Sequence, residues 1–246
     1  RLADEMMYVG EKMSKIEGGT KLSSIFDSNW GLFQKDVDLA DHIAKVIEKY
    51  NWPQQIKCTT PKTNWNNLLK IDDKLKNRVG FGLSMQSVNS NTLKEIKRKN
   101  WTLEQYIDFT KELHKREKPV SSEMIIPLPD ESKKTYFEGV KFLMDHNVIP
   151  TTFTLMMLCG TELGRDEAIK KYAMKSRFRI LSKQFGNYHG NKVFEIEQIC
   201  VETNVMSYKN YLDCRNFSFI AELFGNPVLR SVYKLTRKLG INFYDF

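Results

Sequence analysis

The sequence predicts an α/β protein with a parallel β-sheet, because segments typical of strands and of helices alternate through its first two thirds. The strand segments are short, apolar and rich in β-branched or aromatic residues, as buried strands are. The helical segments repeat apolar residues every three or four positions. Such alternation requires crossover connections and favours parallel pairing. No GxGxxG motif follows a strand, and the pattern leaves both a doubly wound sheet and a barrel open.

The predicted elements follow one another in a regular order. The chain opens on a helix over residues 2–16. Strands are predicted over residues 22–26, 55–60, 79–84, 121–127 and 152–158, and helices over residues 37–50, 65–76, 103–116 and 132–146. After residue 162 the pattern predicts a long charged helix over 163–184, one or two strands over 192–202, and helices over 207–224 and 227–239. We therefore predict two parts, residues 1–162 and a mostly helical extension over residues 163–246 that packs on the first part.

The composition is that of an ordinary globular protein. Of the 246 residues, 41% are hydrophobic and 28% are charged, and no apolar run approaches the roughly 20 residues that span a bilayer. The first residues lack the apolar core of a signal peptide, so we expect a cytoplasmic protein without a membrane partner. The net charge of +8 is spread over many helical segments, which favours a solvated surface over a nucleic-acid-binding stripe.

The cysteines predict neither a disulfide framework nor a metal site. Cys58, Cys159, Cys200 and Cys214 are far apart, with no CxxC or CxxxC unit among them, so reduced thiols are the simplest interpretation. The four histidines match no metal motif either. We therefore predict no metal ligand in this chain and assign no catalytic residue.

Polar residues at the ends of the predicted strands are the candidates for a binding site, because parallel α/β folds place reactive groups at the carboxyl ends of their strands. Asp27 and Asn29 follow the first predicted strand, and Gln86 follows the third. Glu123 lies in the otherwise apolar segment EMIIPLP. An unpaired carboxylate is costly to bury, so Glu123 is expected to face a polar opening or to have a partner.

Several segments resemble one family in order and spacing. The segment GLSMQSVNSNTLKEIKRKN, from Gly82 to Asn100, resembles the fourth strand and following helix of radical S-adenosylmethionine (SAM) enzymes, with Gln86 at the strand end and Arg98 twelve residues on. EMIIPLPDES resembles the fifth strand of that family, although Pro127 stands where glycine is usual. TLMMLCGTEL, from Thr154, resembles the sixth strand and its Gly-Thr-x-Leu turn.

Two further segments resemble the branch of this family that often carries an N-terminal cobalamin-binding domain. They are IFDSNWGLF, which ends a strand in Asp-x-Asn, and VETNVMSYKNYLDCRNF near the C-terminus. The resemblance implies an α/β fold with a partial TIM-like parallel (β/α) barrel that lacks its first strand, followed by the mostly helical extension. It also implies a SAM-dependent enzyme that uses a 4Fe-4S cluster, with cobalamin as a further cofactor of the full-length parent.

The resemblance assigns roles that suit the chemistry of SAM, which presents a carboxylate, an amino group, ribose hydroxyls and an adenine ring. It implies that Arg98 binds the carboxylate. Gln86 and Glu123 would contact the ribose and the amino group, and Asp27 and Asn29 the amino end of the methionine. The strand near Leu155 would provide an apolar wall for the adenine.

The sequence departs from the family in one respect that matters for activity. Radical SAM enzymes hold their cluster with three cysteines, usually as CxxxCxxC, and this chain contains no such triplet. We therefore expect that an N-terminal domain of the same protein is missing from this chain and is its partner. We also expect that the chain cannot cleave SAM by itself. The small-molecule substrate is not specified.

Two alternatives from other classes stay open at this point. One is a cofactor-free TIM-like lyase that uses Lys57 as a Schiff base, which would require a buried lysine. The other is a non-catalytic basic module that binds RNA or another anionic partner, supported by aromatic residues such as Trp65 and Trp101 among the lysines.

Overall fold

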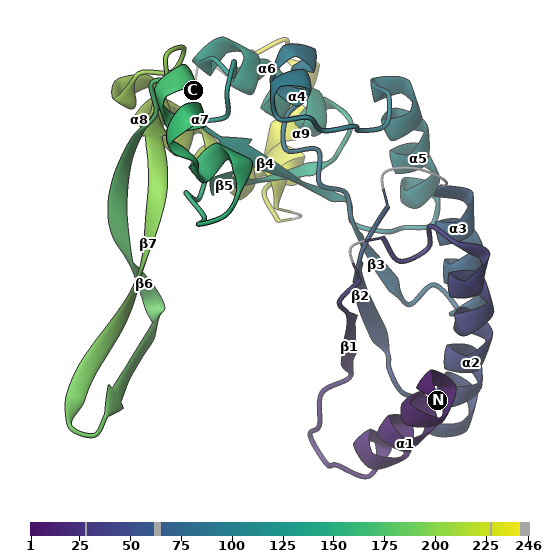
Figure 1. Cartoon of the computed structure of the whole chain (residues 1–246). Coiled ribbons are helices and arrows are strands. Elements are labelled where there is room, and N and C mark those ends of the chain that lie inside the picture. Colours follow the sequence, from purple (N-terminus) through teal and green to yellow (C-terminus); the bar gives the residue numbers. More distant parts are fainter. Residues whose placement is uncertain (28, 62–64, 227, 242–246) are drawn as a thin grey trace. The chain divides into compact units, whose positions relative to one another are not determined.

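The computed structural model describes residues 1–27, 29–61, 65–226 and 228–241 (Figure 1). The chain divides into two compact units. The first unit comprises Arg1–Ser84 and Asn100–Ser121, and the second comprises Met85–Lys99 and Ser122–Phe246. The predicted boundary between residues 162 and 163 does not coincide with this division and stays a prediction.

The first unit contains three parallel strands and four helices among its described residues. In chain order they are α1 (Leu2–Ser14), β1 (Leu22–Ile25), α2 (Gln34–Tyr50), β2 (Gln55–Thr59), α3 (Trp65–Lys74), β3 (Val79–Gly82) and α5 (Leu103–Lys115). The register places Ser24 of β1 beside Lys57 of β2, and Lys57 beside Gly80 of β3. The predicted strands and helices of this region are confirmed to within a few residues at their ends.

One face of these strands is buried and the other is exposed. On β2, Ile56 and Cys58 are buried, whereas Gln55, Lys57 and Thr59 are exposed. Figure 1 shows α2, α3 and α5 along one side of the strands. The helices supply most of the core, which includes Val37, Ala40, Ile43, Val46, Leu68, Ile71, Leu75, Tyr106, Phe109 and Leu113. Burial on a single face explains the alternation of apolar and polar residues along β2.

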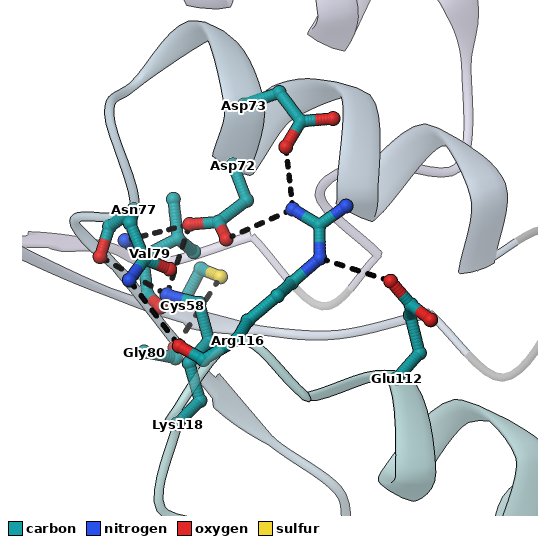
Figure 2. A network of polar contacts seen from close by, with 9 residues as sticks. All are labelled: Cys58, Asp72, Asp73, Asn77, Val79, Gly80, Glu112, Arg116 and Lys118. Atoms are coloured by element: carbon teal, nitrogen blue, oxygen red, sulfur yellow. Dashed lines mark hydrogen bonds and ion pairs between the residues drawn. The ribbon is translucent and has the colours of Figure 1, made fainter. Parts of the chain in front are cut away.

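A buried ion pair connects α3, β3 and the segment after α5 (Figure 2). Asp72 is fully buried, and its Oδ1 lies 3.0 Å from the Nζ of Lys118. The same Oδ1 accepts a hydrogen bond from the backbone N–H of Val79 at 3.2 Å. The Nζ of Lys118 also donates to the carbonyl oxygens of Asn77 and Val79, at 3.1 and 2.6 Å. The pair therefore holds the end of α3 at the beginning of β3.

The second unit contains the remaining helices and strands, including a long hairpin. Its elements are α4 (Ser90–Glu95), β4 (Ser121–Ile126, whose first residue belongs to the first unit), α6 (Lys133–Asp145), β5 (Ile149–Thr154), the 3-10 helix η1 (Glu162–Gly164), α7 (Asp166–Lys171), β6 (Lys175–Tyr188), β7 (Asn191–Glu202), α8 (Tyr208–Gly225) and α9 (Arg230–Lys238). The five strands of the sheet follow the order β1-β2-β3-β4-β5, and the β3–β4 pair is parallel like the two before it. The predicted α/β class is confirmed.

Two predictions for the C-terminal half are wrong. The predicted helix over 163–184 is replaced by the short helix α7 and by β6, which pairs antiparallel with β7. The residues from Arg177 to Ile180 alternate between cationic and apolar side chains, a period of two that suits a strand. The predicted strand over 152–158 is displaced, since β5 begins at Ile149 and ends at Thr154. Leu155 still donates its N–H to the carbonyl of Ile126 in β4, whereas the N–H of Met157 donates to the carbonyl of Gln198 in β7.

The β6–β7 hairpin has one apolar face. Cross-strand pairing joins Ile180 to Ile196 and Phe185 to Phe194, and Phe178 lies on the same face by alternation. All five side chains are more than half exposed.

None of the described helices combines the length and the hydrophobicity of a membrane-spanning segment.

Candidate functional site

The turn after β3 brings Gln86 against β4. The backbone N–H of Gln86 donates to the carbonyl of Glu123 at 2.8 Å, and the N–H of Ile125 donates to the carbonyl of Gln86 at 2.9 Å. Gln86 has a φ of 62°, in the left-handed region. A non-glycine residue with this conformation is uncommon and persists where its surroundings fix it. The fixed backbone leaves the Gln86 side chain half-buried beside the strand.

Arg98 is placed by α4 and the turn that ends it. Asn89 caps α4, since its side chain accepts a hydrogen bond from the N–H of Asn91, as preferred N-cap residues do. After α4 the N–H of Arg98 donates to the carbonyl of Leu93 at 2.8 Å, which folds the chain back. Arg98 is half-buried, and burial lowers the pKa of its guanidinium while the charge of Glu123 opposes that change. Arg98 and Glu123 therefore lie within electrostatic reach of each other.

The structure thus places three of the predicted site residues, Gln86, Arg98 and Glu123, together in the second unit. Glu123 is exposed, as expected for a carboxylate that faces an opening. Leu155 lies nearby in the sheet, where its N–H donates to the carbonyl of Ile126 at 2.8 Å. The side chain of Leu155 is buried in a cluster with Leu128, Ala168, Tyr172, Met174 and Cys200, and its contact with an adenine ring stays a prediction.

Asp27 and Asn29 lie in the first unit. Both are exposed, and Oδ1 of Asp27 accepts a hydrogen bond from the N–H of Asn29 at 2.8 Å. Asp27 lines a shallow cavity of about 510 Å³ together with Trp30 and His42. The carboxylate is available to a cationic ligand, and the roles of both residues stay predictions.

Sequence reasoning missed the contacts that fix the loops around Gln86. Glu131 is 1% exposed, and its two carboxylate oxygens accept hydrogen bonds from the hydroxyl groups of Ser87 and Thr135. Burial raises the pKa of Glu131, and the two hydrogen bonds oppose that rise. The side-chain N–H of Asn89 also donates to the carbonyl of Asp130 at 3.1 Å. The acidic turn in PLPDES was visible in the sequence, but its partner Ser87 lies 44 residues earlier.

A cavity of about 360 Å³ lies beside α4 and α7. Ile96 lines this cavity and packs on the cluster around Leu155. Also in the lining, the Nζ of Lys171 lies 2.7 Å from Glu95, and the hydroxyl of Tyr172 donates to the same carboxylate at 2.6 Å. A lining with both apolar and charged groups suits a ligand that has an apolar ring and polar substituents.

The comparisons with known proteins agree on one kind of enzyme. No family model matches the chain. The chain is 24% identical over 204 residues to the cobalamin-dependent radical SAM methyltransferase TokK from Streptomyces tokunonensis, covering 80% of this chain and 29% of TokK. It is also 24% identical over 199 residues to the 2-(S-pantetheinyl)-carbapenam-3-carboxylate methyltransferase from Streptantibioticus cattleyicolor, covering 78% of this chain and 29% of that protein. The chain is related to the cobalamin-dependent radical SAM methyltransferases.

A solved structure shows the same fold. TsrM, a radical SAM methyltransferase from Kitasatospora setae with tryptophan substrate and the SAM analogue aza-SAM bound, superimposes with a TM-score of 0.53 at 13% identity, covering 74% of this chain and 35% of that chain. The resemblance to radical SAM enzymes is confirmed. The chain spans 29% of the length of the two curated relatives.

The cysteines do not form the cluster site of a radical SAM enzyme. Cys58, Cys200 and Cys214 are buried, and burial raises the pKa of their thiols to about 12, about 11 and about 12. Cys159 is exposed. Among the described residues, no three metal-ligating side chains come together, so these thiols do not fit a 4Fe-4S cluster. Lys57 is exposed on β2 and lacks the burial that a Schiff-base lysine needs.

The raised pKa of Glu131 predicts a pH dependence of stability. The folded chain keeps this proton at pH values where the unfolded chain, with a carboxyl pKa near 4.5, has released it. The free energy of unfolding should therefore fall as the pH rises above that value and level off beyond the folded-state pKa. Urea unfolding followed by far-UV circular dichroism from about pH 4.5 to about pH 8 should show this fall in the wild type relative to Glu131→Gln. A difference between the two proteins that is the same at every pH would contradict the prediction.

Proposed function

We propose that this chain is the SAM-binding part of a cobalamin-dependent radical SAM methyltransferase, folded as part of a TIM-like barrel. The observation that carries the proposal is the cluster of Gln86, Arg98 and Glu123 on adjacent elements of the second unit. Both curated relatives that match most of the chain are methyltransferases, of which TokK is a cobalamin-dependent radical SAM enzyme, and TsrM shares the fold. The activity, substrate and partners of the whole protein are part of this proposal.

The cluster suits the methionine and ribose of SAM. Arg98 offers a guanidinium for the carboxylate, because an arginine–carboxylate pair gains charge-assisted hydrogen bonds. Its half-buried position strengthens that attraction by excluding water. Gln86 and Glu123 offer an amide and a carboxylate to the ribose hydroxyls and the amino group. The apolar cluster around Leu155 and the cavity over Ile96 offer a place for the adenine ring.

The 4Fe-4S cluster and cobalamin enter the proposal through the relatives alone. A 4Fe-4S cluster would supply the electron for reductive cleavage of SAM, but the cysteines of this chain do not fit it, so its ligands would have to come from another part of the protein. Cobalamin would also be bound by another part of the protein, the N-terminal domain that the family resemblance implies. A small-molecule substrate would complete the reaction.

Removal of the Arg98 guanidinium is expected to weaken SAM binding. Arg98→Gln should raise the dissociation constant of SAM about 10- to 100-fold, because a hydrogen bond to a charged group contributes roughly 1.5–3 kcal/mol. Isothermal titration calorimetry of the chain would measure the constant. Lys99→Gln is the matched control, since it removes an exposed cation from the next residue.

The two outcomes separate clearly. A loss confined to Arg98→Gln supports a SAM site in the second unit. Equal effects of the two substitutions, or no binding of SAM by the wild type, would overturn the proposed role of Arg98. Reconstitution with iron and sulfide of a polypeptide that contains this chain and a CxxxCxxC motif, with assay of 5′-deoxyadenosine, tests the radical chemistry.

A further inference from the structure

Glu131 is a buried carboxylate with no cationic partner in the described chain. It is 1% exposed and lies just before Ser132, the N-cap of α6. Among the described residues, no lysine, arginine or histidine lies within ion-pair distance of it. Its hydrogen-bond partners are the hydroxyl groups of Ser87, on Oε2, and Thr135, on Oε1. A buried carboxylate without a cation is costly, so a purely structural position would be better filled by apolar side chains.

The two hydroxyl contacts of Glu131 join it to two different segments of the chain. Thr135 lies in the first turn of α6, the helix that begins just after Glu131. Ser87 lies in the loop between β3 and α4, directly after Gln86, and is itself fully buried. The Ser87 hydroxyl oxygen also accepts a hydrogen bond from the N–H of Asn89 at 3.0 Å. Ser87 is thus held by contacts other than the backbone bonds that Gln86 makes with β4.

Gln86 is consequently restrained by two sets of contacts. Its own backbone bonds to Glu123 and Ile125 of β4. The residue after it, Ser87, is held by Glu131. A left-handed conformation of glutamine costs of order 1–3 kcal/mol and is maintained only by such surroundings. Removal of the Ser87–Glu131 contact would release one of the two restraints.

We infer that Glu131 is a positioning residue, which acts through Ser87 to hold Gln86 in the conformation that presents its side-chain amide to SAM. The inference rests on the proposed function, because it deepens the description of the same SAM site. Glu131 itself does not touch the ligand. Its effect is on the geometry of Gln86, and a preorganised contact loses affinity when the group that holds it is removed.

The network offers a matched pair of substitutions. Ser87→Ala removes the contact that leads to Gln86, and Thr135→Val removes the other hydroxyl contact of the same carboxylate. Glu131→Gln keeps the volume of the side chain but replaces one of its two acceptor oxygens with an NH2 group, which cannot accept a hydrogen bond. We expect Ser87→Ala and Glu131→Gln to raise the dissociation constant of SAM by about five- to tenfold, and Thr135→Val to leave it unchanged, as measured by calorimetry on the full chain. Far-UV circular dichroism would confirm that each variant folds.

A double-mutant cycle separates positioning from a general loss of structure. If Glu131 acts through Gln86, then Glu131→Gln has no further effect on SAM affinity once Gln86 is alanine. Additive effects, or equal losses of SAM affinity in Ser87→Ala and Thr135→Val, would overturn the inference. If the wild type still binds SAM in that case, the proposed function is unaffected. Failure of the wild type to bind SAM would overturn both. Ser87→Ala repeats the test should Glu131→Gln fail to fold.

Discussion

Replacement of Lys118 by methionine is expected to lower the free energy of unfolding of the first unit by about 3–5 kcal/mol. The Nζ of Lys118 is the near partner of the fully buried Asp72 carboxylate, at 3.0 Å. The nearest guanidinium nitrogen of Arg116 lies 3.6 Å from the other carboxylate oxygen. Loss of the ammonium would leave a buried charge with poor compensation and two backbone carbonyls without their donor.

The experiment can follow the first unit alone, because all four tryptophans, Trp30, Trp52, Trp65 and Trp101, belong to it. Urea unfolding would be followed by tryptophan fluorescence. Lys115→Met is the matched control, because Lys115 is an exposed lysine whose pair with Glu112 lies at the surface, and such pairs contribute about 0–1 kcal/mol. Adding Asp72→Leu to Lys118→Met should restore part of the lost stability, because no unpaired charge remains. Equal stability of Lys118→Met and Lys115→Met would contradict the prediction.

Truncation of Phe109 to alanine is expected to have an effect of similar size, about 3–5 kcal/mol. Phe109 is fully buried on α5, and its ring centroid lies 5.1 Å from that of Trp101 and 5.5 Å from that of Trp65. It also meets Phe81 of β3 edge to face at 6.0 Å. The substitution would therefore leave a cavity where α3, β3 and α5 meet.

The same fluorescence experiment measures this loss and reports on its position. Emission from Trp65 and Trp101 should shift to longer wavelength in folded Phe109→Ala, because both indoles lose their aromatic neighbour. Phe26→Ala is the control, since Phe26 is 98% exposed and exposed positions usually change stability by less than about 0.5 kcal/mol. A loss no larger than that of the control would show that the aromatic cluster does not hold the unit together.

The sequence predicted those parts of the protein that depend on local periodicity. The single buried face of β2 leaves Ile56 and Cys58 inside and Lys57 outside, and this alternation is readable without any partner strand. The helices likewise repeat apolar residues at three and four positions. Gln86, Arg98 and Glu123 were predicted because each lies in a segment that resembles a family pattern. The structure bonds the backbone of Gln86 to that of Glu123 and places Arg98 within electrostatic reach of Glu123, and their binding roles stay predictions.

The tertiary structure decided what depends on residues far apart in the sequence. The segment that includes Arg177 and Arg179 alternates as a strand does over four residues, and its pairing with β7 is what extends it as β6 through the region predicted to be a helix. Ser87 meets Glu131 across 44 residues, and this contact helps to fix Gln86 in a left-handed conformation that no sequence motif encodes. Local spacing sets which face of an element is apolar, whereas the partner that covers a polar group is chosen only when the chain folds.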